Sequence, residues 1–320
     1  MRSRLFDLSV VAMALCALCA FAGSAIAEEL IRVGVPTKAY FPTVQTKAAI
    51  DRKLFEKEGL RCEMTVYRGG GEAFEAVAAG SADLSQVSAH LVAIARKRGV
   101  LSRLVGAGAD EWAGWILAVK SDSKVQSVKD LNGAKVGITS AGSATDALAL
   151  WTANQYKISL SRIAVGGGGL VPNLKSGNLD AAVIYSPLSY QLIKEQSVRV
   201  LVDFSKAMPP NLIGGWAVSE KLLKEKPQFV LKGLNAIYGG MEYLMANRDF
   251  AIKLIAENNE LPMEVARLEY ENTFPKLSRD GKMRVETVKA ALEFAKLTGA
   301  KDLAPADEVF QNLNIIPTKP

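Results

Sequence analysis

The chain has 320 residues, of which 49% are hydrophobic and 22% are charged. This composition excludes a disordered chain, a collagen and a coiled coil, and the length is enough for two domains of ordinary size. The formal net charge of +6 is modest and the basic residues are spread along the chain, so nucleic-acid binding is not expected.

The first 27 residues have the pattern of a secretory signal peptide. A basic start over 1–4 precedes an apolar run, and Ala25–Ile26–Ala27 ends it with the small residues typical of a signal-peptidase site. The apolar run is short for a bilayer span. We therefore expect cleavage after Ala27 and a mature protein in the periplasm. Only Cys62 of the three cysteines would remain, so no intramolecular disulfide is expected.

Short β-rich runs then alternate with segments of helical periodicity, which predicts an α/β fold with largely parallel sheets. Strands are predicted at 31–35, 62–67, 83–87, 101–107, 115–119, 135–138, 181–185 and 198–204, with helices at 43–57, 72–79, 144–156 and 187–195. From Glu220 the pattern is helical, with apolar periods over 228–247, 249–258, 263–273 and 283–298. We expect this C-terminal segment to pack against the first sheet.

An internal repeat links the two halves of this pattern. Gly71, Gly80 and Asp83 recur as Gly168, Gly177 and Asp180, with the same offset of 97 residues throughout. Each copy indicates a glycine turn, a short helix, a glycine that ends the helix and a buried strand. Two βαβ units can look alike without being copies, but the matched spacing favours two similar α/β lobes.

Residues that could carry catalysis are scarce. Beyond the signal peptide the chain has one histidine, His90, and one cysteine, Cys62, so no metal cluster or nucleophile pair of the usual kind is expected. The glycine runs 69–71 and 166–169 lack the Lys-Ser/Thr of a phosphate loop. We therefore expect no enzyme and no cofactor, and we interpret the glycines as places where backbone N–H groups approach something closely.

The segment 139–146 is the candidate anion site, because it lies between a predicted strand and a predicted helix. A helix N-terminus offers unpaired N–H donors and partial positive charge, and Ser143 and Thr145 add hydroxyl groups. The alternative is that Ser143 only caps the helix with Asp146 as its partner. Asp146 would repel an anion if it faced the ligand.

Aromatic residues at strand ends supply the other half of a possible pocket. In open α/β sheets ligands bind beyond the carboxyl ends of the strands, which makes Tyr40, Ser88 and Tyr185 eligible. Trp115 and Trp216 sit within apolar runs and are expected in the core. Arg68 precedes the first glycine run and could pair with an anion, or it could be a solvated loop residue.

These features together resemble the periplasmic substrate-binding proteins of ABC importers in the nitrate, sulfonate and taurine group, which includes binders of thiamine-pyrimidine precursors. The resemblance covers the whole chain after the signal peptide and depends on 54–85, 128–143, 167–187 and 216–230. The chain lacks the cysteine-rich motif of the eukaryotic thiamine-pyrimidine synthases.

The resemblance implies a type II periplasmic binding fold, with two Rossmann-like lobes joined by a hinge of two crossing strands. One lobe would comprise 28–118 and 206–320, and the other 119–205. The ligand contacts that it implies are Thr37, Tyr40 and Phe41; Gly70 and Gly71; Ser88; Ser143, Ala144 and Thr145; and Tyr185 and Ser186.

The sequence therefore predicts a monomeric solute-binding protein that captures a small, anionic organic molecule between two lobes and delivers it to the permease of an ABC importer. Two alternatives stay open. One is an enzyme on the same scaffold, pyrimidine-synthesising or lyase-like, that uses His90. The other is a binding component that serves a signalling receptor.

Overall fold

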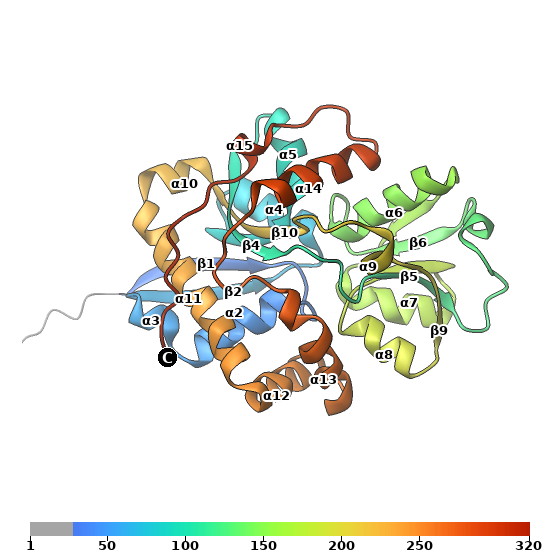
Figure 1. Cartoon of the computed structure of the whole chain (residues 1–320), viewed down its shortest axis with the longest axis horizontal. Helices are drawn as coiled ribbons and strands as arrows, with labels where there is room; N and C mark the ends of the chain where they lie inside the picture. Colours follow the sequence, from blue (N-terminus) through green and yellow to red (C-terminus); the bar gives the residue numbers. More distant parts are fainter. Residues whose placement is uncertain (1–27) are drawn as a thin grey trace, which may run out of the picture.

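The computed structural model describes residues 28–320, and the predicted signal peptide lies outside the described residues. The chain forms two five-stranded sheets, each covered by helices (Figure 1). We call the body around the first sheet lobe 1 and the body around the second sheet lobe 2. The first sheet has the order β2-β1-β3-β10-β4 and the second has the order β7-β6-β8-β5-β9.

Each of the eight predicted strands overlaps an observed strand. The strands of lobe 1 are β1 (Glu29–Val35), β2 (Leu60–Val66), β3 (Leu84–Ser88), β4 (Ser102–Ala109) and β10 (Gly214–Ser219). Those of lobe 2 are β5 (Ile116–Lys120), β6 (Lys135–Ile138), β7 (Ser161–Ala164), β8 (Ala181–Ile184) and β9 (Val198–Asp203). The sequence patterns did not indicate β7 or β10.

In each sheet four strands run in the same direction and one runs against them. The reversed strand is β10 in the first sheet, antiparallel to β3 and β4, and β5 in the second, antiparallel to β8 and β9. The expectation of largely parallel sheets is therefore confirmed, and the sheets are mixed. The chain crosses between the lobes twice, over 110–115 and over 204–213. The boundary predicted at 118 falls inside β5, which pairs only with strands of the second sheet.

The helices follow the expected alternation. Between the strands lie α2 (Phe41–Asp51), α3 (Leu54–Lys57), α4 (Gly70–Ala78), α5 (Ala89–Lys97), η1 (Val128–Leu131), α6 (Ala144–Tyr156), η2 (Gly167–Gly169), α7 (Leu170–Ser176), α8 (Leu188–Lys194) and α9 (Phe204–Ala207). The helical C-terminal segment contains α10 (Glu220–Glu225), α11 (Pro227–Ala246), α12 (Arg248–Asn259), α13 (Met263–Asn272), η3 (Phe274–Lys276), α14 (Val285–Leu297) and α15 (Ala306–Val309). Its end lies along the first sheet, where Gln311 N donates to Leu104 O at 2.9 Å.

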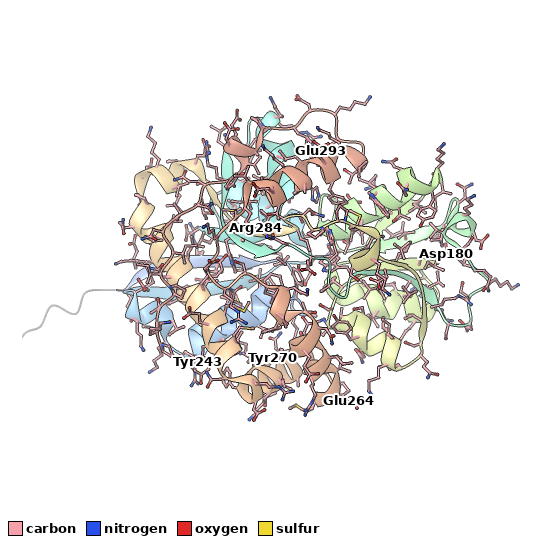
Figure 2. The ribbon with its side chains drawn as sticks, in the orientation of Figure 1. Asp180, Tyr243, Glu264, Tyr270, Arg284 and Glu293 are labelled. Carbon is pink, nitrogen blue, oxygen red and sulfur yellow. The ribbon has the colours of Figure 1, made fainter. Side chains whose placement is uncertain are left out.

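The repeat seen in the sequence is a repeat of structure. Asp83 Oδ2 accepts a hydrogen bond of 2.8 Å from Arg32 N in β1, and Asp180 Oδ2 accepts one of 2.7 Å from Lys135 N in β6. Asp180 is labelled on lobe 2 in Figure 2. The two sheets also share one strand order, with β6 in the place of β1 and β8 in the place of β3. The same local pairing therefore fixes both halves.

No helix within residues 28–320 is both long and apolar enough to cross a membrane. The largest apolar cluster contains residues of both lobes, so the lobes share part of one core in this conformation. Trp216 is fully buried in a cluster of lobe 1, as expected.

Candidate functional site

A small cavity lies between the lobes, where strands β1, β3, β6 and β8 end. It is lined by Pro36, Thr37, Tyr40, Gly70, Gln86, Val87, Ser88, Trp115, Thr139, Ser143, Ala144, Thr145, Tyr185 and Ile213. The volume open to the centres of water molecules is about 30 Å³, which corresponds to roughly two waters and is less than an organic solute needs. The lobes or the lining side chains must therefore move before a solute can occupy it.

The N-terminus of α6 forms the lobe 2 side of the cavity. Thr145 Oγ1 accepts a hydrogen bond from Thr139 N at 2.8 Å and lies 2.7 Å from Ser143 Oγ. Ser143 is the N-cap, and its Oγ accepts from Asp146 N at 3.3 Å. The N–H groups of Ala144 and Thr145 have no acceptor within the helix, because they belong to its first turn. Hydroxyl and backbone donors therefore gather at the positive end of a helix dipole.

The carboxylate of Asp146 points away from the cavity. It pairs with the Arg162 guanidinium, and its Oδ2 accepts from Gly142 N at 2.9 Å. Asp146 is absent from the cavity lining. The repulsion that a carboxylate would exert on an anion is therefore not a feature of this site.

Backbone groups of one lobe contact the other lobe beside the cavity. Gly71 N donates to Ser140 Oγ at 3.1 Å, and Gly167 N donates to Arg68 O at 2.8 Å. A Cβ at Gly71 would lie 2.1 Å from Ala141 O. Glycine is therefore required at this position for the lobes to approach as they do, which confirms the close backbone approach expected for this run.

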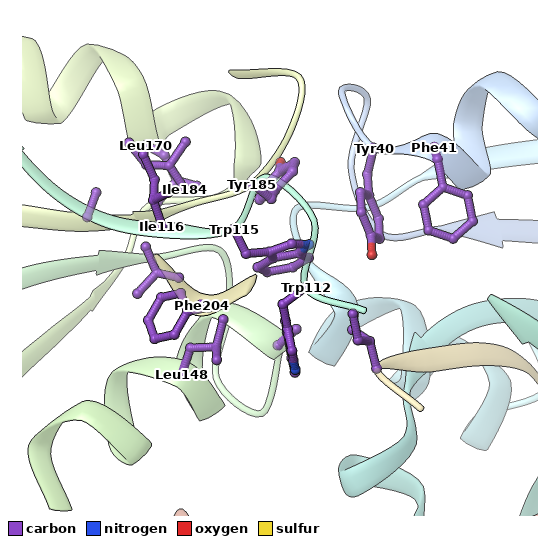
Figure 3. Packing of buried hydrophobic residues seen from close by; sticks show 14 of the residues in the cluster. Tyr40, Phe41, Trp112, Trp115, Ile116, Leu148, Leu170, Ile184, Tyr185 and Phe204 are labelled. Atoms are coloured by element: carbon purple, nitrogen blue, oxygen red, sulfur yellow. The ribbon is translucent and has the colours of Figure 1, made fainter. Parts of the chain in front are cut away.

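Three aromatic side chains, labelled in Figure 3, line the cavity and form its apolar wall. The ring centroids of Tyr40, Trp115 and Tyr185 are 5.4 to 5.6 Å apart. They come from the start of α2, from the first crossing segment and from the end of β8. Tyr185 Oη also donates to Thr37 Oγ1 at 3.0 Å. The wall therefore joins both lobes and one crossing segment.

The lobe 1 side of the cavity is neutral and polar. Gln86 and Ser88 are 4% and 6% exposed, and they lie on the same face of β3 because strand side chains alternate. Within residues 28–320, neither side chain forms a hydrogen bond with the protein. None of the residues that line the cavity in this part of the chain is charged.

His90 lies at the start of α5 and does not line the cavity. Its ring packs edge-on against Phe294 with centroids 5.9 Å apart. Burial lowers the pKa of His90 to about 4, and the nearby Asp146 only partly offsets this effect. The imidazole is therefore neutral at physiological pH. No cluster of three or more potential metal-ligating His, Cys, Asp or Glu side chains occurs in the described part of the chain.

A buried carboxyl group lies at a second contact between the lobes. Glu269, on α13, is 2% exposed, and its Oε2 accepts a hydrogen bond of 3.0 Å from Thr273 Oγ1. Thr273 Oγ1 also lies 3.1 Å from Ser186 Oγ and 3.2 Å from Tyr190 Oη, both in lobe 2. Burial raises the pKa of Glu269 to about 7, although hydrogen bonds from Ser186 and Thr273 act in the opposite direction.

Eight of the twelve residues predicted from the sequence line the cavity: Thr37, Tyr40, Gly70, Ser88, Ser143, Ala144, Thr145 and Tyr185. The other four lie elsewhere. Arg68 is exposed and its guanidinium is 3.8 Å from Glu72, so the solvated alternative describes it better. Phe41 packs against Tyr40, Gly71 contacts lobe 2, and Ser186 joins the Glu269 network.

Gln86 was not predicted from the sequence as a cavity residue, and Trp115, an aromatic residue at a strand end, was expected in the core. Trp115 is 5% exposed and lines the cavity as well. The available signal for Gln86 was a polar residue inside a buried strand pattern, which is informative because buried polar groups need partners.

Comparisons with known proteins agree with this architecture. A family model described as NMT1/THI5 like matches residues 45–251. The chain is 24% identical over 248 residues to a Bacillus subtilis (strain 168) protein assigned as an aliphatic sulfonates-binding protein, covering 77% of this chain and 74% of the relative.

Solved structures share the fold. The alkanesulfonate-binding protein SsuA from Xanthomonas axonopodis pv. citri, bound to MOPS, has a TM-score of 0.74 and 19% identity, covering 89% of this chain and 98% of that one. The periplasmic aliphatic sulphonate binding protein SsuA from Escherichia coli has a TM-score of 0.69 and 20% identity, covering 90% and 94%. The desulfurization enzyme DSZB is also similar, with a TM-score of 0.59, 14% identity and coverage of 88% and 96%. The fold therefore occurs in binding proteins and in an enzyme.

Proposed function

Because the chain belongs to the NMT1/THI5-like family, we propose that it is a periplasmic solute-binding protein that closes its two lobes on a small organic anion and delivers it to an ABC importer. The observation that carries this proposal is the N-terminus of α6 in a cavity between two lobes. Ser143, Thr145 and the first-turn N–H groups can hold an anionic group without a cationic side chain.

The aromatic wall would hold the body of the solute. Tyr40, Trp115 and Tyr185 are all at most 7% exposed and belong to both sides of the cleft. Closing the lobes removes solute and protein surface from water together, which favours binding. An affinity in the micromolar range corresponds to roughly 8 kcal/mol. A few preorganised hydrogen bonds and aromatic burial are a sufficient source for that free energy.

Closure supplies the signal for delivery. The contacts between the lobes include hydrogen bonds beside the cavity, from Gly71 N to Ser140 Oγ, from Gly167 N to Arg68 O and from Tyr185 Oη to Thr37 Oγ1. These contacts form only when the lobes meet, so a solute that contacts both lobes shifts the population towards the closed form. The closed form, as a monomer, would be the form that a permease recognises.

The test is isothermal titration calorimetry of the mature chain with sulfonates, carboxylates and pyrimidines. We expect an organic anion to bind, and Thr145→Val to weaken it at least tenfold because Thr145 organises the anion site. Thr152→Val is the matched control, since Thr152 lies on the same helix with its hydroxyl on Leu148 O. Equal loss in both variants, or no anion bound by the wild type, would contradict the proposal.

The second candidate is an enzyme, because the desulfurization enzyme has a similar fold. A buried His90 outside the cavity is a poor general base, and a low pKa further reduces its basicity. Turnover of a bound solute that is lost in His90→Ala would favour this candidate over transport.

A further inference from the structure

Gln86 presents an unpaired carboxamide to the cavity from lobe 1. It lies in the middle of β3, between β1 and β10, and is 4% exposed. No hydrogen bond joins its side chain to any other residue within 28–320. The buried Gln45 differs in its amide nitrogen, since its Nε2 donates to Ile237 O at 3.3 Å, although its Oε1 has no partner. A carboxamide has two donor hydrogens and an acceptor oxygen, and burying them without partners is unfavourable.

The neighbouring strands leave room for this side chain. A Cβ at Gly108 would lie 3.2 Å from Gln86 Nε2, and a Cβ at Gly214 would lie 3.0 Å from it. Backbone oxygens lie still closer to these two Cβ positions, Gly214 O at 2.9 Å from the first and Val87 O at 2.4 Å from the second, so the strands themselves require glycine there and the carboxamide lies over the two glycines. The carboxamide therefore lies beside β4 and β10 and borders the cavity.

The repeat shows that the fold itself does not need a polar residue here. The offset of 97 residues that relates Asp83 to Asp180 relates Gln86 to Val183, in the central strand β8 of the second sheet. Val183 is fully buried in the apolar cluster. An apolar side chain therefore satisfies the same register in lobe 2, and the carboxamide of lobe 1 has no equivalent structural role.

Polar groups face the cavity from both lobes. Ser88 and Gln86 lie on the lobe 1 side, and Ser143 and Thr145 lie on the lobe 2 side. Gly70 lies between Ser88 of lobe 1 and Ser143 of lobe 2, because a Cβ at Gly70 would be 3.9 Å from Ser88 Oγ and 4.0 Å from Ser143 Cβ. A solute with its anionic group at α6 would therefore share one cavity with the Gln86 carboxamide.

We propose that Gln86 is a specificity-determining residue, and that the solute is an organic anion with a hydrogen-bonding group, such as a hydroxyl or an amide, at the end remote from its charge. This inference rests on the proposed function. A plain alkyl tail would leave the carboxamide buried and unpaired in the closed form. Sites built to hydrogen-bond a substituent reject the analogue that lacks it far more strongly than apolar pockets discriminate methylenes.

The experiment uses two matched pairs of probes in titration calorimetry. These are 2-hydroxyethanesulfonate against propane-1-sulfonate, and 3-hydroxypropanoate against butanoate, in which a methyl group replaces the hydroxyl. We expect the wild type to bind the hydroxylated member of at least one pair about tenfold or more tightly. In Gln86→Met we expect that preference to disappear while the alkyl member binds no more weakly. Gln45→Met is the control and should keep the wild-type preference.

The outcomes separate this inference from the proposed function. If a probe binds but shows no hydroxyl preference, or if Gln86→Met retains it, the role of Gln86 is refuted and the anion site stands. If no member of either pair binds, both proposals fail. The melting temperature without solute is an independent readout. An unpaired carboxamide predicts that Gln86→Met melts no lower than the wild type, whereas a clear decrease would indicate a structural role and overturn the inference.

Discussion

Glu269 should make the stability of the protein depend on pH. Its carboxyl is 2% exposed and accepts a hydrogen bond from Thr273 Oγ1, and no ion pair in the described part of the chain includes it. Tyr40, Tyr190 and Ser186 are the other polar groups near it. Burial raises its pKa from the ordinary value of 4.5 to about 7. The folded protein therefore retains this proton at pH values where the unfolded chain has lost it.

The direction and size of the effect follow from proton linkage. Below pH 4.5 both states are protonated and the contribution of Glu269 to stability is complete. As pH rises towards 7 the unfolded chain releases its proton first, so the free energy of unfolding falls, and above 7 the loss is complete. A shift from 4.5 to about 7 corresponds to about 3 kcal/mol, because each pKa unit is worth about 1.4 kcal/mol.

Glu269→Gln removes the titrating group and keeps the size of the side chain. We expect the variant to match the wild type near pH 4.5 and to be up to about 3 kcal/mol more stable at pH 8, in urea unfolding at a series of pH values. Glu264→Gln is the control, because Glu264 lies on the same helix but is exposed and 3.2 Å from Lys194. If the wild-type and Glu269→Gln curves run parallel across this range, Glu269 does not titrate as the structure implies.

Two further predictions concern the contact between the lobes and the repeat. Gly71→Ala should weaken solute binding at least tenfold, because its Cβ would lie 2.1 Å from Ala141 O in the other lobe. Small-angle scattering with solute should then give a larger radius of gyration than for the wild type. Gly168→Ala is the control and should change neither quantity, because no atom lies within 4 Å of its Cβ position. Asp83→Ala should lower the free energy of unfolding by about 2 to 3 kcal/mol, because Asp83 accepts charge-assisted hydrogen bonds from Arg32. Asp180→Ala should lower it by about 1 kcal/mol, because Asp180 is exposed. Urea unfolding that ranks the two variants in the opposite order would contradict this assignment.

Most of the fold follows from hydrophobic periodicity, and the two missed strands show its limit. Strand β7 is a short edge strand whose residues are all exposed, so it carries no burial pattern to detect. Strand β10 begins with Gly214 and Gly215, which indicate a turn when the sequence is considered alone. A Cβ at Gly215 would lie 2.2 Å from Gly106 O, so this glycine is required by a neighbouring strand that is distant in sequence.

The candidate site was predictable where a local motif fixes it. Ser143, Ala144 and Thr145 are at a helix start that is evident from the sequence, and the structure has them in the cavity. Arg68 was chosen for its charge, yet its guanidinium lies near Glu72, and the hydrogen bond that it makes to lobe 2 is through its carbonyl. The direction of a long side chain depends on tertiary neighbours that no local pattern specifies.

The internal repeat separates the residues that make the fold from those that make the site. Where the halves agree, as at Asp83 and Asp180, the shared residue pairs with the neighbouring strand. At two positions where the halves differ, the lobe 1 residue lines the cavity: Ser88, whose counterpart Tyr185 lines it as well, and Gln86, whose counterpart Val183 lies in the core. Two copies of one scaffold therefore supply the walls, and these departures from symmetry make equivalent positions of the two lobes chemically different where they meet at the cavity. A symmetric cavity could not orient a solute whose two ends differ, whereas this one can.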